Sequence, residues 1–211
     1  MDLARQMDRL VELEVHHLAG LSEGSFRAFA AVLPNVDQGI IAIHPSLVPA
    51  SRLAPLLSRA GKPGFVVVDM IDLDDFIPLP EITIPDQPLY LVQGLERGDD
   101  MSNWSPDEAL PEICARGRSP LTVNEGISWL LQDPGQLQAN YCFMCVASRK
   151  PKGTRLDART PAIWISGGTG RDGRANRDAP KVGWCWAGNR HTWLGFASAA
   201  HRLPQFLPTP K

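Results

Sequence analysis

Apolar positions at helical spacing predict two helices at the amino end of the chain. In residues 2–19, leucine, methionine and valine recur every three or four positions, and Gly20 follows them as a helix C-cap. Residues 23–33 predict a second, shorter helix that ends at Pro34. The chain therefore opens with amphipathic helices that need an apolar partner.

The clearest supersecondary pattern lies between residues 39 and 70. Residues 39–43 and 65–69 are short apolar runs, typical of buried strands, and residues 50–60 between them have helical spacing. Strand, helix and strand within roughly thirty residues predict a right-handed βαβ crossover. Pro55 falls inside the helical segment, where it would kink the helix or lie in its first turn.

Two capping boxes mark helix starts in the middle of the chain. Ser105 and Thr122 each stand three positions before a glutamate, and Pro106 follows the first of them. These signals predict helices that run through Ala115 and Leu131. Residues 88–93 form an apolar run before the first box and predict a third strand.

Beyond residue 145 the pattern becomes that of β structure. Residues 162–166, 182–186 and 192–196 predict strands, and residues 187–191 predict the connection of an antiparallel hairpin between the last two. The polar, glycine-rich residues 167–180 predict a mobile surface loop. The predicted fold is α+β: N-terminal helices, one βαβ-like unit and a C-terminal antiparallel β hairpin region that share one core.

Charge divides this pattern into two parts. Residues 1–145 carry 9 basic and 20 acidic residues, whereas residues 146–211 carry 12 and 3. With 44% hydrophobic residues in 211, the composition favours one soluble domain over 1–211, with an acidic helical and βαβ part and a basic part rich in tryptophan and glycine. The simplest interpretation is that the two parts neutralise each other.

The totals also exclude some classes of protein. A net charge of −2 argues against a general nucleic-acid binder. The amino end has no apolar signal-peptide region, and no run approaches the roughly 18–20 apolar residues of a membrane span. We therefore expect a cytoplasmic protein with free thiols and no membrane contact. The sequence identifies neither a cofactor nor an oligomeric state.

The turn of the predicted hairpin is the first candidate site. His191 can exchange protons near neutral pH and Arg190 can hold a carboxylate or phosphate, so this pair is the catalytic candidate. The alternative is a tryptophan-rich core beneath a turn that satisfies its own backbone. The predicted ligand-binding residues are Asn189, Trp184, Trp186, Trp193, Arg171 and Arg174.

The predicted crossover supplies a second candidate site. If its two strands are parallel, His44, Asp69 and Asp72 lie at one sheet edge, where ligands of open α/β sheets bind. Clustered carboxylates suit a divalent cation or raise one another's pKa. The alternative is a capped turn with solvated charges.

Two further motifs carry weaker signals. Cys142, Cys145, Cys185 and His191 have the residue types of a zinc site. Because Cys142 and Cys145 belong to an apolar, strand-like run, they face opposite sides, and no metal site is predicted. The glycine-rich loop lacks the Gly-Lys-Ser/Thr ending of a phosphate-binding loop, so it predicts a surface insertion or a lid rather than a nucleotide site.

About half of the chain resembles an uncharacterised, mainly actinobacterial family classed as a domain of unknown function. The segments that carry the resemblance are residues 121–126, 147–149, 161–166 and 183–199. The resemblance implies no activity, cofactor or catalytic residue.

Two functions from different classes remain open. The first is the binding of a small anionic or planar ligand at the basic Trp/His hairpin, with or without catalysis. The second is a non-catalytic interaction module that docks an acidic protein or single-stranded nucleic acid through its basic aromatic tail. Salt separates them, because nucleic-acid binding weakens steeply with ionic strength, whereas a pocket that desolvates its ligand responds less.

Overall fold

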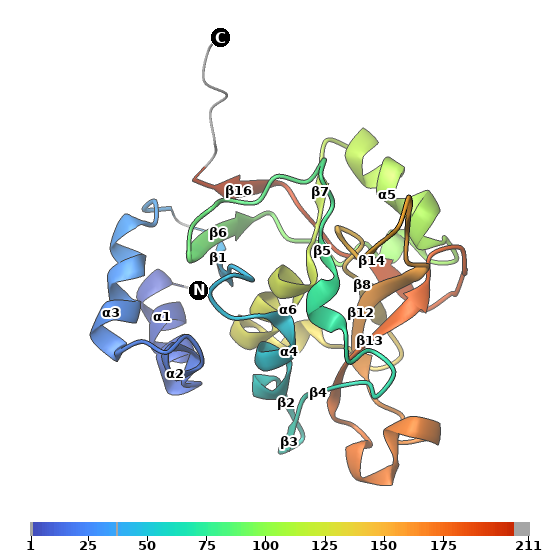
Figure 1. Cartoon of the computed structure of the whole chain (residues 1–211), viewed down its shortest axis with the longest axis horizontal. Coiled ribbons are helices and arrows are strands. Elements are labelled where there is room, and N and C mark those ends of the chain that lie inside the picture. Colours follow the sequence, from blue (N-terminus) through green and yellow to red (C-terminus); the bar gives the residue numbers. More distant parts are fainter. Residues whose placement is uncertain (1, 37, 205–211) are drawn as a thin grey trace.

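The computed structural model describes residues 2–36 and 38–204, and Figure 1 shows helices at one side and a sheet at the other. The helices are α1 (Leu3–Glu12), α2 (Val15–Leu18), α3 (Glu23–Ala28), α4 (Ala50–Leu53), α5 (Pro106–Ala115) and α6 (Val123–Gln132). The 3₁₀ turns are η1 (Phe29–Val32), η2 (Ala54–Leu56), η3 (Leu73–Asp75), η4 (Asp99–Met101), η5 (Pro134–Gln136), η6 (Gly170–Asp172) and η7 (Arg174–Asn176).

The strands form one three-stranded sheet, one five-stranded sheet and four short two-stranded pairs. The strands are β1 (Ile40–Ile43), β2 (Ser58–Arg59), β3 (Lys62–Pro63), β4 (Phe65–Val66), β5 (Ile77–Pro78), β6 (Leu89–Gln93), β7 (Ser119–Pro120), β8 (Cys142–Met144), β9 (Ser148–Arg149), β10 (Pro151–Lys152), β11 (Arg155–Leu156), β12 (Arg159–Ile165), β13 (Pro180–Trp186), β14 (Leu194–Phe196), β15 (Ser198–Ala199) and β16 (His201–Leu203). Mixed sheets with separate helices confirm the predicted α+β class.

Local signals placed the helix starts well. Ser105 and Thr122 cap α5 and α6, and both capping boxes form with their reciprocal bonds to Glu108 and Glu125. The first predicted helix is broken instead, because Glu14 adopts a left-handed conformation (φ 57°) between α1 and α2. Tertiary packing therefore overrides a continuous helical pattern at this position.

The predicted βαβ crossover is wrong. β1 pairs with β6 in the antiparallel three-stranded sheet, while β4 pairs with β13 in the five-stranded sheet. α4 ends at Leu53, one residue before the η2 turn that contains Pro55, and is too short to cross back over a sheet. The hairpin of β2 and β3 then turns the chain into the other sheet.

The predicted hairpin between residues 182–186 and 192–196 is also wrong. The order of the five-stranded sheet is β14-β8-β12-β13-β4, so β13 already has a partner on each edge. β14 pairs in parallel with the free edge of β8 instead. An antiparallel hairpin does form in the basic part, but between β12 and β13, with the glycine-rich loop as its connection.

Hydrogen bonds join that loop to the rest of the chain. Lys62 donates to the carbonyls of Ala175 and Arg177. Asp172, in the middle of the loop, accepts from Ser166 and Lys181, which flank the loop. The predicted mobility of the loop stays a prediction.

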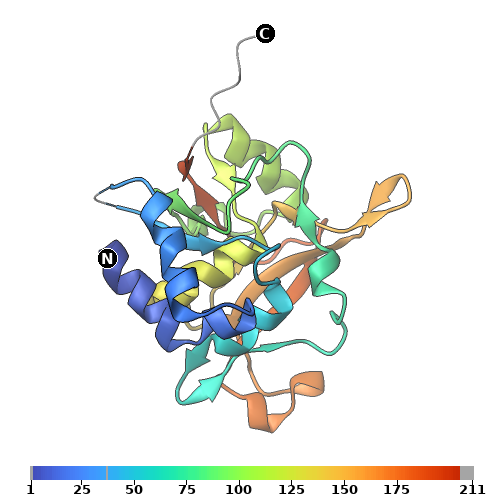
Figure 2. The ribbon, with the colours of Figure 1, turned by 60° about the vertical axis from the view of Figure 1, so that its left-hand side comes forward.

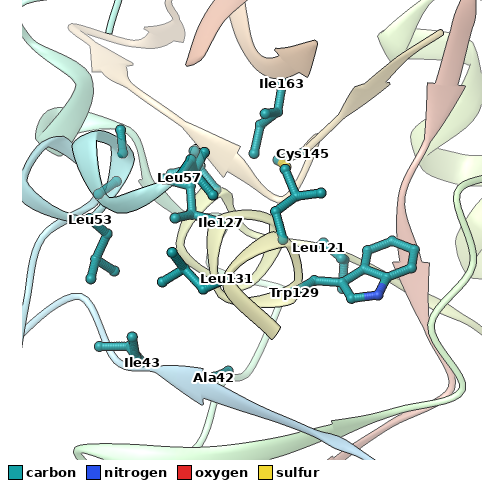
Figure 3. Close-up of a cluster of buried hydrophobic side chains, with 14 of the residues drawn as sticks. Ala42, Ile43, Leu53, Leu57, Leu121, Ile127, Trp129, Leu131, Cys145 and Ile163 are labelled. Carbon is teal, nitrogen blue, oxygen red and sulfur yellow. The ribbon is translucent and has the colours of Figure 1, made fainter. Parts of the chain in front are cut away.

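Helix α6 lies at the centre of the main core, which draws on both charged parts of the chain. Figure 3 shows Ile127 and Leu131 of α6 beside Ile43 of β1, with Ile163 of β12 on the opposite side. Gly126 allows the helix to approach β8 closely, since a Cβ there would lie 2.6 Å from the Sγ of Cys145. A second, smaller cluster covers the other face of the five-stranded sheet beneath α5.

Candidate functional site

One end of the five-stranded sheet, where β8 and β14 begin and β12 ends, carries two adjoining pockets. Both are lined by Cys142, Trp164 and Trp193. The first, of about 140 Å³, is also lined by His191 and is called here the His191 lobe. The second, of about 180 Å³, is also lined by Tyr141 and is called the Tyr141 lobe. Together they form an open aromatic groove.

Trp164 lies in the wall shared by the two lobes, and its neighbours on β13 set its position. A Cβ on Gly183 would lie 2.6 Å from the indole of Trp164, so only glycine lets this ring cross the strand. The ammonium of Lys181 lies 4.5 Å from the centre of the same ring. Lys181 is itself paired with Asp172 at 2.7 Å, so its charge is neutralised.

His191 and Trp193 stand on residues 187–193, the strap that connects β13 to β14. Their rings stack with centroids 4.5 Å apart and planes inclined by 18°. The strap is anchored by the backbone N–H of Asn103, which donates to the carbonyl of His191. Within residues 2–36 and 38–204, no group hydrogen-bonds to the imidazole nitrogens of His191, so they are available to a ligand.

Arg190 belongs to a different pocket from its neighbour His191. Its guanidinium forms two hydrogen bonds to Glu108, the residue that completes the capping box of α5. This contact holds the pKa of the Glu108 carboxyl at about 2, so the pair stays ionised at neutral pH. The pair lines an open cleft of about 460 Å³ beside Trp104. The predicted catalytic pair is therefore not assembled on one pocket.

The other predicted ligand-binding residues are spread over both faces of the sheet. Trp184 borders the His191 lobe, but its indole N–H donates to Asp69, and its ring lies 4.4 Å from that of Trp186. Because Trp184 and Trp186 alternate with Cys185, they share the face opposite to the thiol. Asn189 and Arg174 are exposed and border none of the pockets described. Arg171 pairs with Asp69.

The thiols near the groove are unreactive. Burial raises the pKa of Cys142 and that of Cys185, so both remain protonated, whereas attack on a substrate requires a thiolate. Cys145 packs in the main core, on the face opposite to Cys142. In the described part of the chain, no three His, Cys, Asp or Glu side chains gather as metal ligands.

The second candidate site does not form as predicted. His44 follows β1 in the three-stranded sheet, where its Nδ1 lies 2.6 Å from the Oγ of Ser46 and burial lowers its pKa. Asp69 and Asp72 follow β4, which belongs to the other sheet. The strand ends that would bring the three residues together are therefore in different sheets.

Basic side chains of the carboxyl-terminal part occupy this acidic turn. Arg159 contacts Asp72 at 2.6 Å, and Lys150 bridges Asp72 and Asp75 at 2.8 and 2.7 Å. The hydrogen bond from Arg159 is the main reason why the pKa of Asp72 lies well below its usual range. The turn is a set of satisfied ion pairs rather than a cation site.

Sequence reasoning named His191, Trp184 and Trp193, which line the groove, and missed Trp164 and Tyr141; it considered Cys142 only as a zinc ligand. A signal for Trp164 was present, because it alternates with Ile163 and Ile165 and so faces away from the main core. Tyr141 precedes β8 and lies within 6.0 Å of the guanidinium of Arg97, a contact between distant segments that no local pattern predicts.

The comparisons with known proteins identify a family and no activity. The model of a family of unknown function, DUF5701, matches residues 9–205. No curated protein and no solved structure gives a significant match. Across residues 2–36 and 38–204, no helix has both the length and the apolar character needed to cross a bilayer.

Proposed function

Since the chain belongs to the DUF5701 family, whose function is unknown, we propose its function from the geometry of the site: the protein binds a small planar ligand in the aromatic groove. The observation that carries this proposal is the pairing of Trp164 with the half-exposed Trp193 around open, ring-sized space. Aromatic faces that border open space favour the stacking of a further ring.

The exposure of the groove supports a binding role over a purely structural one. Trp193 is 50% exposed and Tyr141 is 45% exposed, so neither ring is sealed in a core. Large apolar surface left in contact with water is costly, and its concentration at a pocket is typical of ligand sites. Stacking on His191 also keeps the ring of Trp193 in one orientation before any ligand arrives.

The chemistry of the groove supports binding without covalent catalysis. His191 lacks an acid or base partner among the described residues, and the thiols of Cys142 and Cys185 are held protonated by burial. Arg190 is engaged by Glu108 in a separate cleft. Among the described residues that line the groove, no thiol or hydroxyl is hydrogen-bonded to His191, so no nucleophile there is activated by a neighbouring base.

The alternative function, docking through a basic tail, has less support. Most described basic side chains beyond residue 145 are paired within the chain, and those without an ion pair to another described residue are Lys152, Arg155, Arg174 and Arg177. These four belong to the hairpin of β10 and β11 and to the glycine-rich loop. None of the four lines either lobe of the aromatic groove.

The proposal is tested with ¹⁵N-labelled tryptophan, whose indole signals report each ring separately. Titration with 2-naphthol should shift the signals of Trp164 and Trp193 and leave that of Trp104 unchanged. Trp193→Ala should weaken binding about tenfold or more, because one stacking face is lost. His191→Ala should also weaken binding while changing stability by less than about 1 kcal/mol, because its imidazole nitrogens have no hydrogen-bond partner to lose and only the stacking on Trp193 is removed.

Trp104→Ala is the matched control, since this partly exposed ring lines the separate cleft of Arg190 and Glu108, and its loss should leave affinity unchanged. Raising the salt concentration should hardly alter the naphthol affinity. A titration with a short oligothymidylate covers the alternative: tight, salt-sensitive binding of the oligonucleotide together with no response to naphthol would reject the planar-ligand proposal.

A further inference from the structure

The two lobes of the groove differ in size and lining, and this difference specifies the ligand further. An engineered apolar cavity of about 150 Å³ holds one benzene molecule. The His191 lobe, of about 140 Å³, and the Tyr141 lobe, of about 180 Å³, are each of that size. Because Cys142, Trp164 and Trp193 line both, the lobes adjoin.

Charge is absent from the walls of both lobes. The residues that line them include no Asp, Glu, Lys or Arg. Two cations lie beside the lobes and both are paired: Lys181 with Asp172 at 2.7 Å, and Arg97, which lies over the ring of Tyr141, with Asp99 at 3.0 Å. A formally charged group that entered either lobe would lose its hydration without gaining a counter-ion, which is strongly unfavourable.

Polar groups are distributed unequally between the lobes. The His191 lobe offers an imidazole whose nitrogens have no hydrogen-bond partner in the described chain, and the thiol of Cys185. The Tyr141 lobe offers mainly ring faces, together with the hydroxyl of Tyr141 and the exposed amide of Asn140. A ring that carries a hydroxyl or a ring nitrogen suits the first lobe, and a mainly apolar ring suits the second.

We propose that the natural ligand of the groove is an uncharged molecule of two fused or linked aromatic rings, with its hydrogen-bonding group in the His191 lobe. This inference rests on the proposed function and narrows it: planarity alone would admit one ring or an anion. It also separates the groove from the cleft of Arg190 and Glu108, where the charged side chains lie.

Three probes of graded chemistry test the inference by calorimetry and indole NMR at pH 7. Phenol has one ring, 2-naphthol has two and is uncharged, and 2-naphthoate has two and is an anion. The expected order is 2-naphthol tighter than phenol by at least about tenfold, because a second ring is buried. 2-Naphthoate should bind at least about tenfold more weakly than 2-naphthol, because its charge is unpaired.

Two variants each alter one lobe. They distinguish binding in both lobes from a general preference of the protein for larger apolar probes. Cys185→Leu fills the His191 lobe, and Tyr141→Ala removes a wall of the other lobe from an exposed position. Each should remove most of the naphthol advantage over phenol. Trp104→Ala, in the separate cleft, should preserve that advantage. If Cys185→Leu fails to fold, Tyr141→Ala alone carries the test.

The outcomes distinguish this inference from the function on which it rests. Equal affinities of phenol and 2-naphthol, with shifts at Trp164 and Trp193, would overturn the two-ring ligand and keep the planar site. Tighter binding of 2-naphthoate than of 2-naphthol would overturn the uncharged ligand and favour an anion. No response of these two indole signals to any probe would overturn both proposals.

Discussion

The acidic residues 1–145 and the basic residues 146–211 differ sharply in charge, yet the structure joins them. Six basic residues of the second part form ion pairs with acids of the first: Arg149 with Asp107, Lys150 with Asp72 and Asp75, Arg159 with Asp72, Arg171 with Asp69, Arg190 with Glu108, and Arg202 with Glu125. Opposite net charges in two parts of a sequence therefore need not indicate binding to a charged partner, because the two parts can form ion pairs with each other.

The two parts also share their main apolar core. Met7 and Leu10 from the first part belong to the same buried cluster as Ile163 and Val182 from the second. In the turned view of Figure 2, strands of the second part run behind the helices of the first. Burial of apolar area supplies most of the attraction between the parts, and the ion pairs set their register.

The largest effect is expected when residues 1–145 are separated from residues 146–211. We predict that the chain is a single folding unit, so that limited proteolysis releases no stable fragment that ends near residue 145. Each part alone would expose its side of the shared core. Mass spectrometry of the digestion products provides the measurement, and the appearance of two protease-resistant pieces would show independent domains.

Arg202→Ala should give the largest effect of a single substitution. Glu125 is fully buried and accepts from the Nε and Nη2 of Arg202 at 2.6 and 2.9 Å. Without this partner a buried carboxylate remains unpaired, which should cost about 3–5 kcal/mol in the free energy of unfolding by urea. Arg202→Lys, which keeps the charge without the planar fork, should cost less. Equal stability of Arg202→Ala and the wild type would show that the pair is dispensable.

Asp72→Asn should have an intermediate effect that depends on pH. The pKa of Asp72 is lowered chiefly by Arg159, so its carboxylate stabilises the fold above the unfolded pKa of about 3.9 and loses this effect as pH falls toward the folded pKa. The variant should lose about 1–2 kcal/mol at pH 7. The difference from the wild type should shrink progressively below about pH 4. Urea titrations at several pH values test this, and a difference that is constant with pH would contradict it.

Arg171→Ala should have the smallest effect. Its side chain is 75% exposed, and its only ion pair among the described residues is with Asp69 at 2.7 Å. Exposed pairs of this kind contribute less than about 1 kcal/mol and are screened by salt. Thermal unfolding at low and high salt should show a small difference that disappears at high salt. A larger loss would indicate that Arg171 docks the glycine-rich loop through more than this pair.

Local sequence signals predicted the positions of helices and strands better than they predicted which strands pair with each other. The capping boxes at Ser105 and Thr122 place the starts of α5 and α6 because the bonds involved span only three residues. The same reasoning located β12 and β13 from their apolar runs but paired the second of them with the wrong strand. Pairing depends on which edges remain free once the whole sheet has formed, and that information is not local.

The candidate site shows the same division. Trp193 and His191 were predicted as site residues from their spacing and residue types. Arg190 was predicted with them, but it binds Glu108 instead, because α5 packs beside the strap. Trp164 and Tyr141 joined the groove from segments far from the strap in sequence. Residue type thus indicated aromatic chemistry in the right region, and packing decided which rings meet.

By itself, the sequence determined the α+β class, the helix starts and the placement of opposite charges in two parts of one chain, because these follow from local hydrogen bonding and composition. Only the tertiary structure decided that basic side chains of residues 146–211 form ion pairs with acidic side chains of residues 1–145. It also decided that the aromatic groove at the strand ends has no charged residue in its lining. The physical reason is that ion pairs and pockets form between residues distant in sequence, and their partners are chosen by the shared core that brings them together.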